Sequence, residues 1–143
     1  MTTLEYLIVR LSIDYNSTGM KKVAIQGIKG CFHEQAVYRF YEKEGLPKPE
    51  VVECKSFEDL YRRMNEGAAD AAIMAIENTV SGGLLPNFEL LRKYNRKIKG
   101  EVFLRIKQNL MTLPGQRIED LHEVRSHYMA INQTRQYFDA YPW

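Results

Sequence analysis

The chain has 143 residues, of which 45% are hydrophobic and 27% are charged, and its formal net charge is +2. This length suits one domain or two small lobes of an ordinary soluble protein. The near balance of charge excludes a strongly basic or acidic surface, so neither nucleic acid nor a membrane is expected as a partner. No apolar run approaches the roughly 20 residues that a membrane span needs.

The cysteines give little sign of special chemistry. Cys31 and Cys54 are the only two in the sequence, and neither belongs to a Cys-x-x-Cys pattern, so we expect no metal site. Because no secretory signal accompanies them, two reduced thiols are favoured over a disulfide. We therefore predict a cytoplasmic protein.

The first segment, residues 1–19, differs in texture from the rest of the chain. Its apolar run LEYLIVRLSI has no basic leader and no small-residue cleavage site, which makes it a poor signal peptide. The polar stretch DYNSTG then interrupts it, and Met20-Lys21-Lys22 resembles a second start just before a strand. We therefore predict that residues 1–19 are an extension outside the core fold.

Strands and helices alternate in the next part of the chain. Apolar and β-branched residues predict strands in VAIQ, PEVVECKS and DAAIMAIE, and each is followed by a helix with apolar residues at helical spacing. The third strand is apolar throughout, as expected for a strand that is covered on both faces. This order predicts an α/β fold, in which the strand-to-helix loops gather at the edge of the sheet where ligands bind.

The pattern changes after Gly100. EVFLRIKQNLMTL alternates apolar and polar residues, which indicates a half-exposed strand. A turn at Pro114-Gly115, a short helix in IEDLHEV, a strand ending in VRSH and a final helix in YMAINQTRQYFDAY follow. We assign residues 20–99 to a first lobe and residues 100–143 to the beginning of a second, incomplete lobe.

The loop after the first of these strands is rich in glycine. Gly27 and Gly30 permit a tight turn and leave backbone amides bare at the start of a helix, where an anion gains roughly 0.3–1 kcal/mol. Cys31 and Phe32 complete this candidate anion-binding loop, and no catalytic partner for Cys31 is evident. The alternative is a plain tight turn without a ligand.

A polar triplet ends the third strand. Glu77, Asn78 and Thr79 offer an acceptor, an amide and a hydroxyl. Gly82 lets the loop that follows approach a ligand closely. Buried polar groups need partners, and at a sheet edge that partner can be a polar ligand. The alternative is helix capping, for which Asn and Thr are natural residues.

A hydroxyl and an amide recur near the last helix. Ser126 and His127 stand at the predicted strand-to-helix junction, and Gln133 follows about two helical turns after Ser126. Ser126 and Gln133 would share a face if the helix begins at Ser126, and together they could bind carboxylate and hydroxyl groups. The alternative is capping by Ser126 with a solvated Gln133.

Taken together, these stretches resemble the prephenate dehydratase family. The first loop matches its Gly-x-x-Gly-[Thr/Ser]-Phe-[Ser/His]-x-x-Ala motif at Gly27, Gly30, Cys31, Phe32, His33 and Ala36. The Glu-Asn-[Ser/Thr]-x-x-Gly motif falls on Glu77, Asn78, Thr79 and Gly82, and the Ser-His motif with a later Gln falls on Ser126, His127 and Gln133. The resemblance runs from Met20 to the last residue.

The resemblance implies a two-lobed, periplasmic-binding-protein-like (type II) α/β architecture with the active site between the lobes. It also implies the decarboxylating dehydration of prephenate to phenylpyruvate in phenylalanine biosynthesis, without a metal or organic cofactor, by a protein that is usually a homo-oligomer. The implied substrate-binding residues are Glu77, Asn78, Thr79, Gly82, Ser126, His127 and Gln133.

The sequence departs from the family pattern at one important point. The Thr-Arg-Phe motif, which carries the residue usually assigned as proton donor, has no counterpart up to Trp143, and Thr134 in the similar stretch TRQY is not given that role. We expect the motif to lie beyond Trp143, so the catalytic residues stay unassigned and the chain is expected to be an incomplete fragment, weak or inactive alone. Two alternatives stay open: a non-catalytic small-carboxylate binding module of the same fold, and arogenate in place of prephenate.

Overall fold

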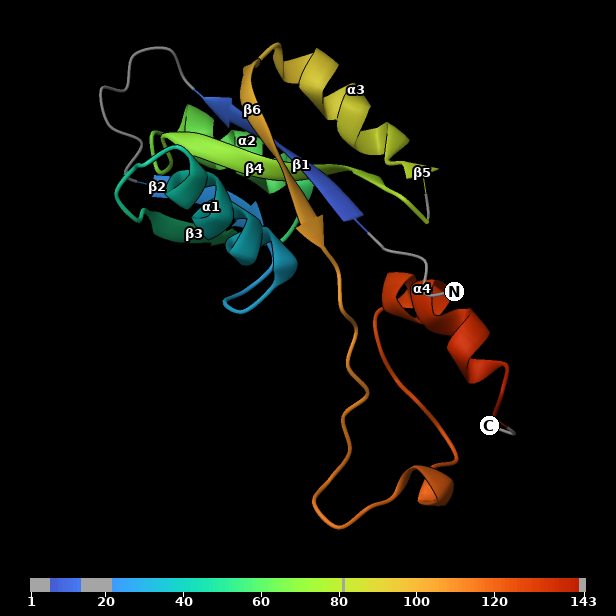
Figure 1. Cartoon of the computed structure of the whole chain (residues 1–143). Helices are drawn as coiled ribbons and strands as arrows, with labels where there is room; N and C mark the ends of the chain where they lie inside the picture. Colours follow the sequence, from blue (N-terminus) through green and yellow to red (C-terminus); the bar gives the residue numbers. More distant parts are fainter. Residues whose placement is uncertain (1–5, 14–21, 81, 142–143) are drawn as a thin grey trace. The chain divides into compact units, whose positions relative to one another are not determined.

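A computed structural model describes residues 6–13, 22–80 and 82–141 (Figure 1). The chain divides into two compact units, residues 1–106 and residues 107–143, and each is described by itself. The division therefore falls after Ile106 rather than after residue 99 as we expected. The physical reason is that the alternating strand beginning near Gly100 belongs to the sheet of unit 1, where Val102, Leu104 and Ile106 are buried in its core.

Unit 1 is built on a mixed sheet with the strand order β3-β2-β4-β1-β6. β2 is parallel to both β3 and β4, whereas β1 is antiparallel to β4 and β6. A two-residue strand, β5, pairs back onto the end of β4. The strands are β1 (Tyr6–Ile13), β2 (Lys22–Gln26), β3 (Glu50–Cys54), β4 (Ala71–Asn78), β5 (Gly82–Gly83) and β6 (Lys97–Arg105).

The position of β1 corrects the prediction that residues 1–19 lie outside the fold. Residues 6–13 form backbone pairs with β4 on one side and with β6 on the other, so β1 joins β6 to the rest of the sheet. The run YLIVRLSI has the β-branched, apolar composition that suits a strand. The remaining residues of the predicted extension lie outside the described residues.

Trp143, at the other end of the chain, also lies outside the described residues. The expectation that a Thr-Arg-Phe motif follows Trp143 is therefore not tested by the structure and stays a prediction. The same holds for the proton donor that this motif would carry, so the catalytic residues remain unassigned.

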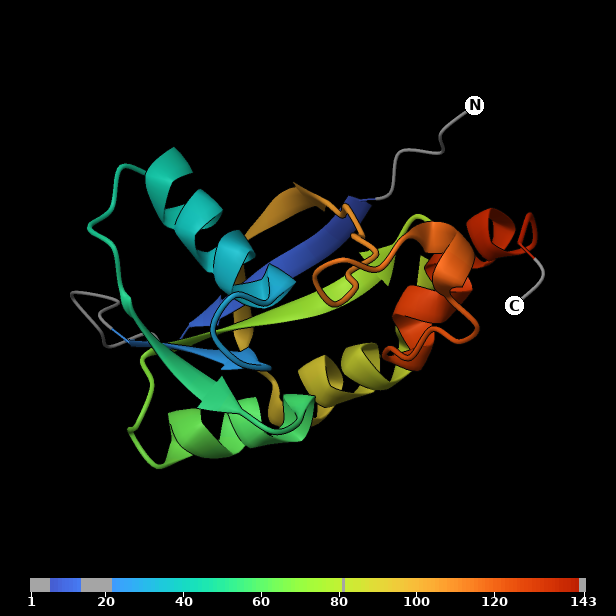
Figure 2. The same ribbon diagram turned by 90° about the horizontal axis from the view of Figure 1, so that it is seen from below.

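Helices cover both faces of the sheet (Figure 2). α1 (Phe32–Lys43) packs on one face, and α2 (Phe57–Asn65) and α3 (Leu85–Tyr94) pack on the other. Successive strand residues alternate between the two cores, as Ile73 and Met74 of β4 do. Burial of β4 on both faces explains its continuous apolar sequence and confirms the predicted α/β class.

The contact between α1 and β6 is unusually close at one point. A Cβ atom placed on Gly100 would lie 2.6 Å from Cε2 of Phe40, which is buried in the core beneath α1. The absence of a side chain at Gly100 therefore lets the Phe40 ring lie against the backbone of β6. This contact helps to fix the strand that leads out of unit 1.

Unit 2 contains a turn of 3-10 helix (Ile118–Asp120) and the helix α4 (Tyr128–Phe138). The final helix confirms the prediction, but IEDLHEV forms only the short 3-10 turn, and VRSH is not a strand in the described part of unit 2. None of the described residues from 107 to 141 is buried. Without a packed core or a neighbouring strand among the described residues of unit 2, VRSH has no strand with which to pair. None of the described helices in either unit has the length and hydropathy that a bilayer span requires.

Candidate functional site

Two of the predicted site loops leave the same edge of the sheet in unit 1. β2 and β4 are parallel neighbours, so the loop after Gln26 and the loop after Asn78 both begin at the carboxyl ends of the strands. That edge is where open α/β sheets bind their ligands. The predicted adjacency of the two loops is therefore confirmed at the level of the sheet.

The first loop needs its glycines for conformation. Gly27 and Gly30 have φ values of +118° and +88°, which residues other than glycine rarely adopt. The Gly27 N–H donates to the Cys54 carbonyl at 3.0 Å, and this ties the loop to the end of β3. A Cβ on Gly27 would also lie 3.1 Å from the Cys31 sulfur. Both glycines thus build the turn that starts α1 at Phe32.

The amides of this loop are not bare, as the sequence had led us to expect. The Lys29 N–H donates to a carboxylate oxygen of Glu53 at 2.7 Å, and the Gly30 N–H donates to a carboxylate oxygen of Glu34 at 2.6 Å. The Gly30 N–H is the largest cause of a lowered pKa at Glu34, and the Tyr38 hydroxyl adds to it. The loop thus holds carboxylates of its own chain, and binding of an external anion stays a prediction.

His33 lies just inside the start of α1 as a neutral imidazole. Burial lowers its pKa to about 4, against the opposing effect of a hydrogen bond with the Gln26 backbone. Its Nε2 atom is buried without a hydrogen-bond partner among the described residues, and its ring meets that of Phe57 edge-on with centroids 5.4 Å apart. Cys31 directs its thiol to the Gln26 carbonyl at 3.9 Å. These contacts make both side chains parts of the packing beneath the loop.

The second loop turns sharply at the end of β4. Asn78 is 1% exposed, and its side-chain oxygen accepts a hydrogen bond from the Val80 N–H at 2.9 Å. This is a local turn bond of the kind that Asn side chains commonly form. The chain then pairs back on itself, with Gly82 opposite Asn78. The Asn78 oxygen therefore stabilises the turn, and it does not cap α3, whose N-cap is Leu84.

The neighbours of Asn78 are accessible. Glu77, Thr79 and Gly82 are all exposed, so three residues of the second motif lie at the surface at this edge. Exposed apolar side chains lie on the same loops and on the start of α3, and a ligand with a hydrophobic ring could contact them: Ile28, Val80, Leu85 and Phe88. Polar and apolar groups thus occur together at this edge of unit 1.

Sequence reasoning missed Asn87, which is buried in the first turns of α3. It is 4% exposed, and its side-chain Nδ2 donates to the Ala75 carbonyl of β4 at 2.7 Å. A signal was present in the sequence, because an amide in the mostly apolar helix start LLPNFELL has to find a partner if it is buried. It passed unnoticed beside the more prominent Glu-Asn-Thr triplet.

The remaining predicted residues belong to unit 2, where α4 begins at Tyr128, the first residue of the predicted final helix. Its N-cap is His127, whose Nδ1 accepts a hydrogen bond from the Met129 N–H at 3.3 Å. Ser126 therefore precedes the helix, so the condition under which it would share a helical face with Gln133 is not met, and the capping residue is His127 instead of Ser126. Gln133 is half-buried and accepts a hydrogen bond from the Gln108 side chain at 2.9 Å.

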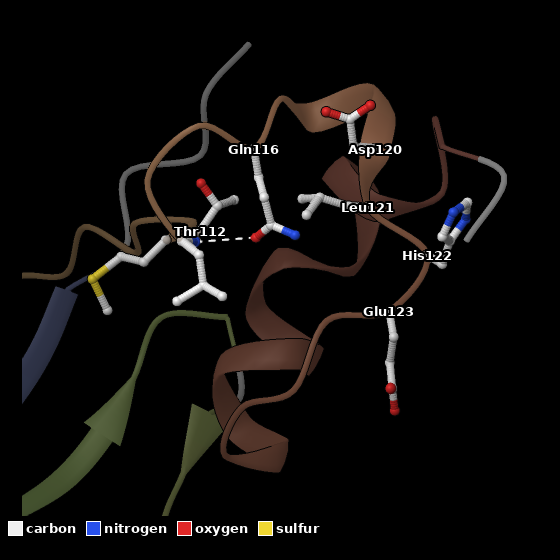
Figure 3. Close-up of a pocket in the computed structure, with 8 residues that line it drawn as sticks. Thr112, Gln116, Asp120, Leu121, His122 and Glu123 are labelled. Carbon is white, nitrogen blue, oxygen red and sulfur yellow. Dashed lines mark hydrogen bonds between the residues drawn. The ribbon is translucent and has the colours of Figure 1, made fainter.

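An open hollow of about 560 Å³ lies in unit 2 (Figure 3). The Leu113 N–H donates to the Gln116 side-chain oxygen at 3.1 Å within it. None of the predicted site residues lines the hollow, which is formed by Met111, Thr112, Leu113, Gln116, Asp120, Leu121, His122 and Glu123. Among the described residues of the whole chain, no group of His, Cys, Asp or Glu side chains could hold a metal ion.

The structure thus brings the first two motifs to one sheet edge in unit 1, whereas the residues of the third motif belong to unit 2. Convergence of all three on one ligand stays a prediction, since they belong to different units. Glycine-rich and amide-bearing loops at the carboxyl edge of parallel strands are typical of α/β domains that bind small molecules. Comparison with known families matches residues 23–142 to the family described as prephenate dehydratase, and the chain belongs to this family.

Curated relatives match over most of this chain but over little of their own length. The Arabidopsis thaliana protein named arogenate dehydratase/prephenate dehydratase 2, chloroplastic, is 35% identical over 112 residues, which are 78% of this chain and 28% of that protein. Arogenate dehydratase 2 of Petunia hybrida is likewise 35% identical over 112 residues, with 78% and 27% covered. The chain therefore spans just over a quarter of the length of these relatives.

Solved structures show a partial similarity. An ATP phosphoribosyl transferase (HisG:HisZ) complex from Thermotoga maritima aligns with a TM-score of 0.45 and 18% identity, over 72% of this chain and 43% of that one. An ancestral amino acid-binding protein, described as a precursor of cyclohexadienyl dehydratase, aligns with a TM-score of 0.42 and 18% identity, again over 72% and 43%.

Proposed function

We propose that this chain is part of an enzyme that converts prephenate to phenylpyruvate with loss of carbon dioxide and water, a step of phenylalanine biosynthesis. The single observation that carries the proposal is the family match over residues 23–142, which includes the glycine loop, the Glu-Asn-Thr triplet and the Ser-His pair. The whole enzyme's activity is inferred from this family, because the chain spans only just over a quarter of the length of its plant relatives.

The chemistry of prephenate explains why the loops are rich in neutral donors. Loss of the ring carboxylate makes the ring aromatic as the hydroxyl departs, so the driving force lies in the substrate. The protein has to hold a dianion, position the ring and supply one proton. In unit 1 the exposed Thr79 hydroxyl and the backbone at Gly82 suit the binding task, while Asn78 shapes the turn that presents them.

In unit 2 we propose that Ser126, His127 and Gln133 contribute further polar contacts. The exposed carboxylate of Glu77 would repel a dianion, so we assign it to the support of neighbouring donors rather than to direct contact with prephenate. The sequence has Gln136 where the family motif has Phe after Thr-Arg, and we assign no proton donor. We therefore expect the chain to bind the substrate but to convert it weakly or not at all.

A second candidate substrate is arogenate, the amino analogue of prephenate. The names of the two plant relatives reported above include arogenate dehydratase, which favours this reading. Arogenate carries an ammonium group, and the exposed Glu77 carboxylate would attract this positive charge. A non-catalytic small-carboxylate binding module is the alternative from another class of protein.

Calorimetric titration of the purified chain with prephenate, arogenate and succinate tests the proposal. We expect prephenate or arogenate to bind at least tenfold more tightly than succinate, and the variant Thr79→Val to lose most of that difference. Equal affinity for all three acids would favour the binding module, and absence of binding would contradict the proposal. In a parallel incubation, near-normal formation of phenylpyruvate would contradict the expected lack of turnover. Assembly into a homo-oligomer and a cytoplasmic location stay predictions.

A further inference from the structure

The loop after β4 is hydrogen-bonded to the strand it has just left. Gly82 and Gly83 pair with Asn78 and Glu77, and the Leu84 N–H donates to the Ile76 carbonyl at 2.8 Å. The turn itself is closed by the bond from the Val80 N–H to Asn78. The exposed Thr79 thus lies on a turn whose two ends are both fixed to β4.

Asn87 adds a bond from the helix that follows. Its side chain donates to the Ala75 carbonyl at 2.7 Å in a buried setting, and its own backbone N–H donates to the Leu84 carbonyl at 2.9 Å. A buried amide is costly unless it is hydrogen-bonded, whereas an apolar side chain would fill the same space without that requirement. The bond between Asn87 and Ala75 therefore has a specific structural effect, which is to join α3 to β4.

The accepting carbonyl lies where the sheet itself is irregular. The pairing of β1 with β4 shifts register between Ile8, which is opposite Glu77, and Val9, which is opposite Ala75. At such a bulge the backbone ladder is locally disrupted. A side-chain donor from α3 at this point stabilises the last residues of β4 directly before the polar triplet.

The other end of α3 is held independently. The rings of Tyr94 in α3 and Tyr61 in α2 stack with centroids 4.5 Å apart and an angle of 5° between their planes. Tyr61 is 1% exposed, so this contact is anchored in the core. α3 is thus attached to α2 near its end and to β4 near its start, and of these two attachments the one at Asn87 adjoins the loop.

We propose that Asn87 is a positioning residue of the candidate site. It is buried and acts through the loop, because its bond to Ala75 fixes where α3 begins and hence where Thr79 and Gly82 present their polar groups. The inference deepens the proposed function and rests on it only for the identity of the ligand. No substrate contact is assigned to Asn87 itself.

The test compares Asn87→Asp with the matched control Asn95→Asp. Aspartate has nearly the shape of asparagine but lacks the N–H donor, and Asn95 is an exposed residue at the other end of the same helix. Backbone amide hydrogen exchange is measured by NMR at Val80, Gly83 and Leu84, and at Ile25 in the core for reference. We expect exchange in the loop to become at least tenfold faster in Asn87→Asp and to change less than twofold at Ile25 and in the control.

Two results would overturn the inference: unchanged exchange in the loop, or equal acceleration at Ile25, which would make Asn87 a general core residue. Prephenate affinity supplies a readout that general packing would not move, and we expect a loss of about tenfold in Asn87→Asp alone. An unchanged affinity beside a loosened loop would also overturn the positioning role. If the unaltered chain binds neither prephenate nor arogenate, the proposed function fails, and the exchange data alone decide whether Asn87 holds the loop.

A measurement on the unaltered chain covers the case in which Asn87→Asp does not fold. The side-chain amide protons of Asn87 should exchange with solvent at least a hundredfold more slowly than those of Asn95. Equal exchange rates would show that the bond to Ala75 does not persist in solution, and would overturn the inference without any variant.

Discussion

The two units differ in what holds their polar residues in place. In unit 1 the loops project from a sheet with buried cores on both faces, so Asn78 and Asn87 are fixed by a scaffold that excludes water. In unit 2 none of the described residues is buried, and Gln133 is held by a hydrogen bond to Gln108. Polar side chains of the same type are therefore held more firmly in unit 1 than in unit 2, because their surroundings are buried in unit 1 and accessible to water in unit 2.

The sharpest way to test this difference is a matched pair of leucine truncations. Leu60 is fully buried in unit 1, and Leu121 is half-buried in unit 2. Leu60→Ala should lower the free energy of unfolding by about 2–5 kcal/mol, because it leaves a cavity in a packed core. Leu121→Ala should change it by less than about 0.5 kcal/mol. Urea denaturation followed by far-UV circular dichroism measures both, and equal effects would contradict the comparison.

The contact between α1 and β6 should give the next largest effect. Gly100→Ala places a Cβ about where the Phe40 ring lies, 2.6 Å from its Cε2 atom, and overpacking of this kind costs about 1–3 kcal/mol. Gly83→Ala is the control, since its Cβ would meet the nearest ring atom of Phe88 at an ordinary 3.5 Å. Unfolding midpoints of the two variants are compared, and a Gly83 variant that is the less stable of the two would refute the packing argument.

His33 should make the stability of unit 1 depend on pH. Its pKa is about 4 in the folded chain and 6.5 when unperturbed, so the unfolded chain binds more protons between these values. The stabilisation from neutral His33 is therefore fully present above pH 6.5 and is lost as pH falls toward 4. Denaturation midpoints across this range should slope accordingly, and His33→Gln should reduce the slope while His122→Gln, in unit 2, should not. A slope that survives in His33→Gln would assign the effect to other groups.

The smallest expected effect concerns the contact between Gln108 and Gln133 in unit 2. Gln133→Ala removes one neutral side-chain hydrogen bond, which is worth about 0.5–1.5 kcal/mol at most and less where water can replace it. We expect amide exchange in α4 to accelerate by less than threefold. If amide exchange in α4 accelerates as strongly as exchange in the loop after β4 does in Asn87→Asp, polar side chains are held equally firmly in the two units and the comparison is contradicted.

Much of unit 1 could be predicted from the sequence because its signals are local. The continuous apolar run of β4 indicated burial on both faces, and helical spacing at Ala36, Val37 and Phe40 indicated the face of α1 that packs on the sheet. The role of β1 could not be predicted, because β1 pairs with β4 and β6, two strands that are distant from it in the sequence. Period and composition alone do not report such non-local pairing.

The candidate site was predictable in composition but not in contacts. The sequence indicated which polar residues follow β4, but not that Asn78 turns its oxygen to Val80. Nor did it show that Glu53, from the neighbouring strand, accepts a hydrogen bond from the Lys29 amide. In unit 2 the sequence indicated the start of α4 but not its capping residue, because Ser126 and His127 are both able to cap a helix and only the backbone decides between them.

The central claim is that the sheet-edge loops of unit 1 bind the substrate. The most direct measurement is a titration of the isotope-labelled chain with prephenate, followed through its backbone amide NMR signals. We predict saturable shifts at Thr79, Gly82 and Gly30, with core signals such as Ile25 unmoved. Shifts confined to unit 2, or no saturable shifts at the loop residues of unit 1, would contradict the claim.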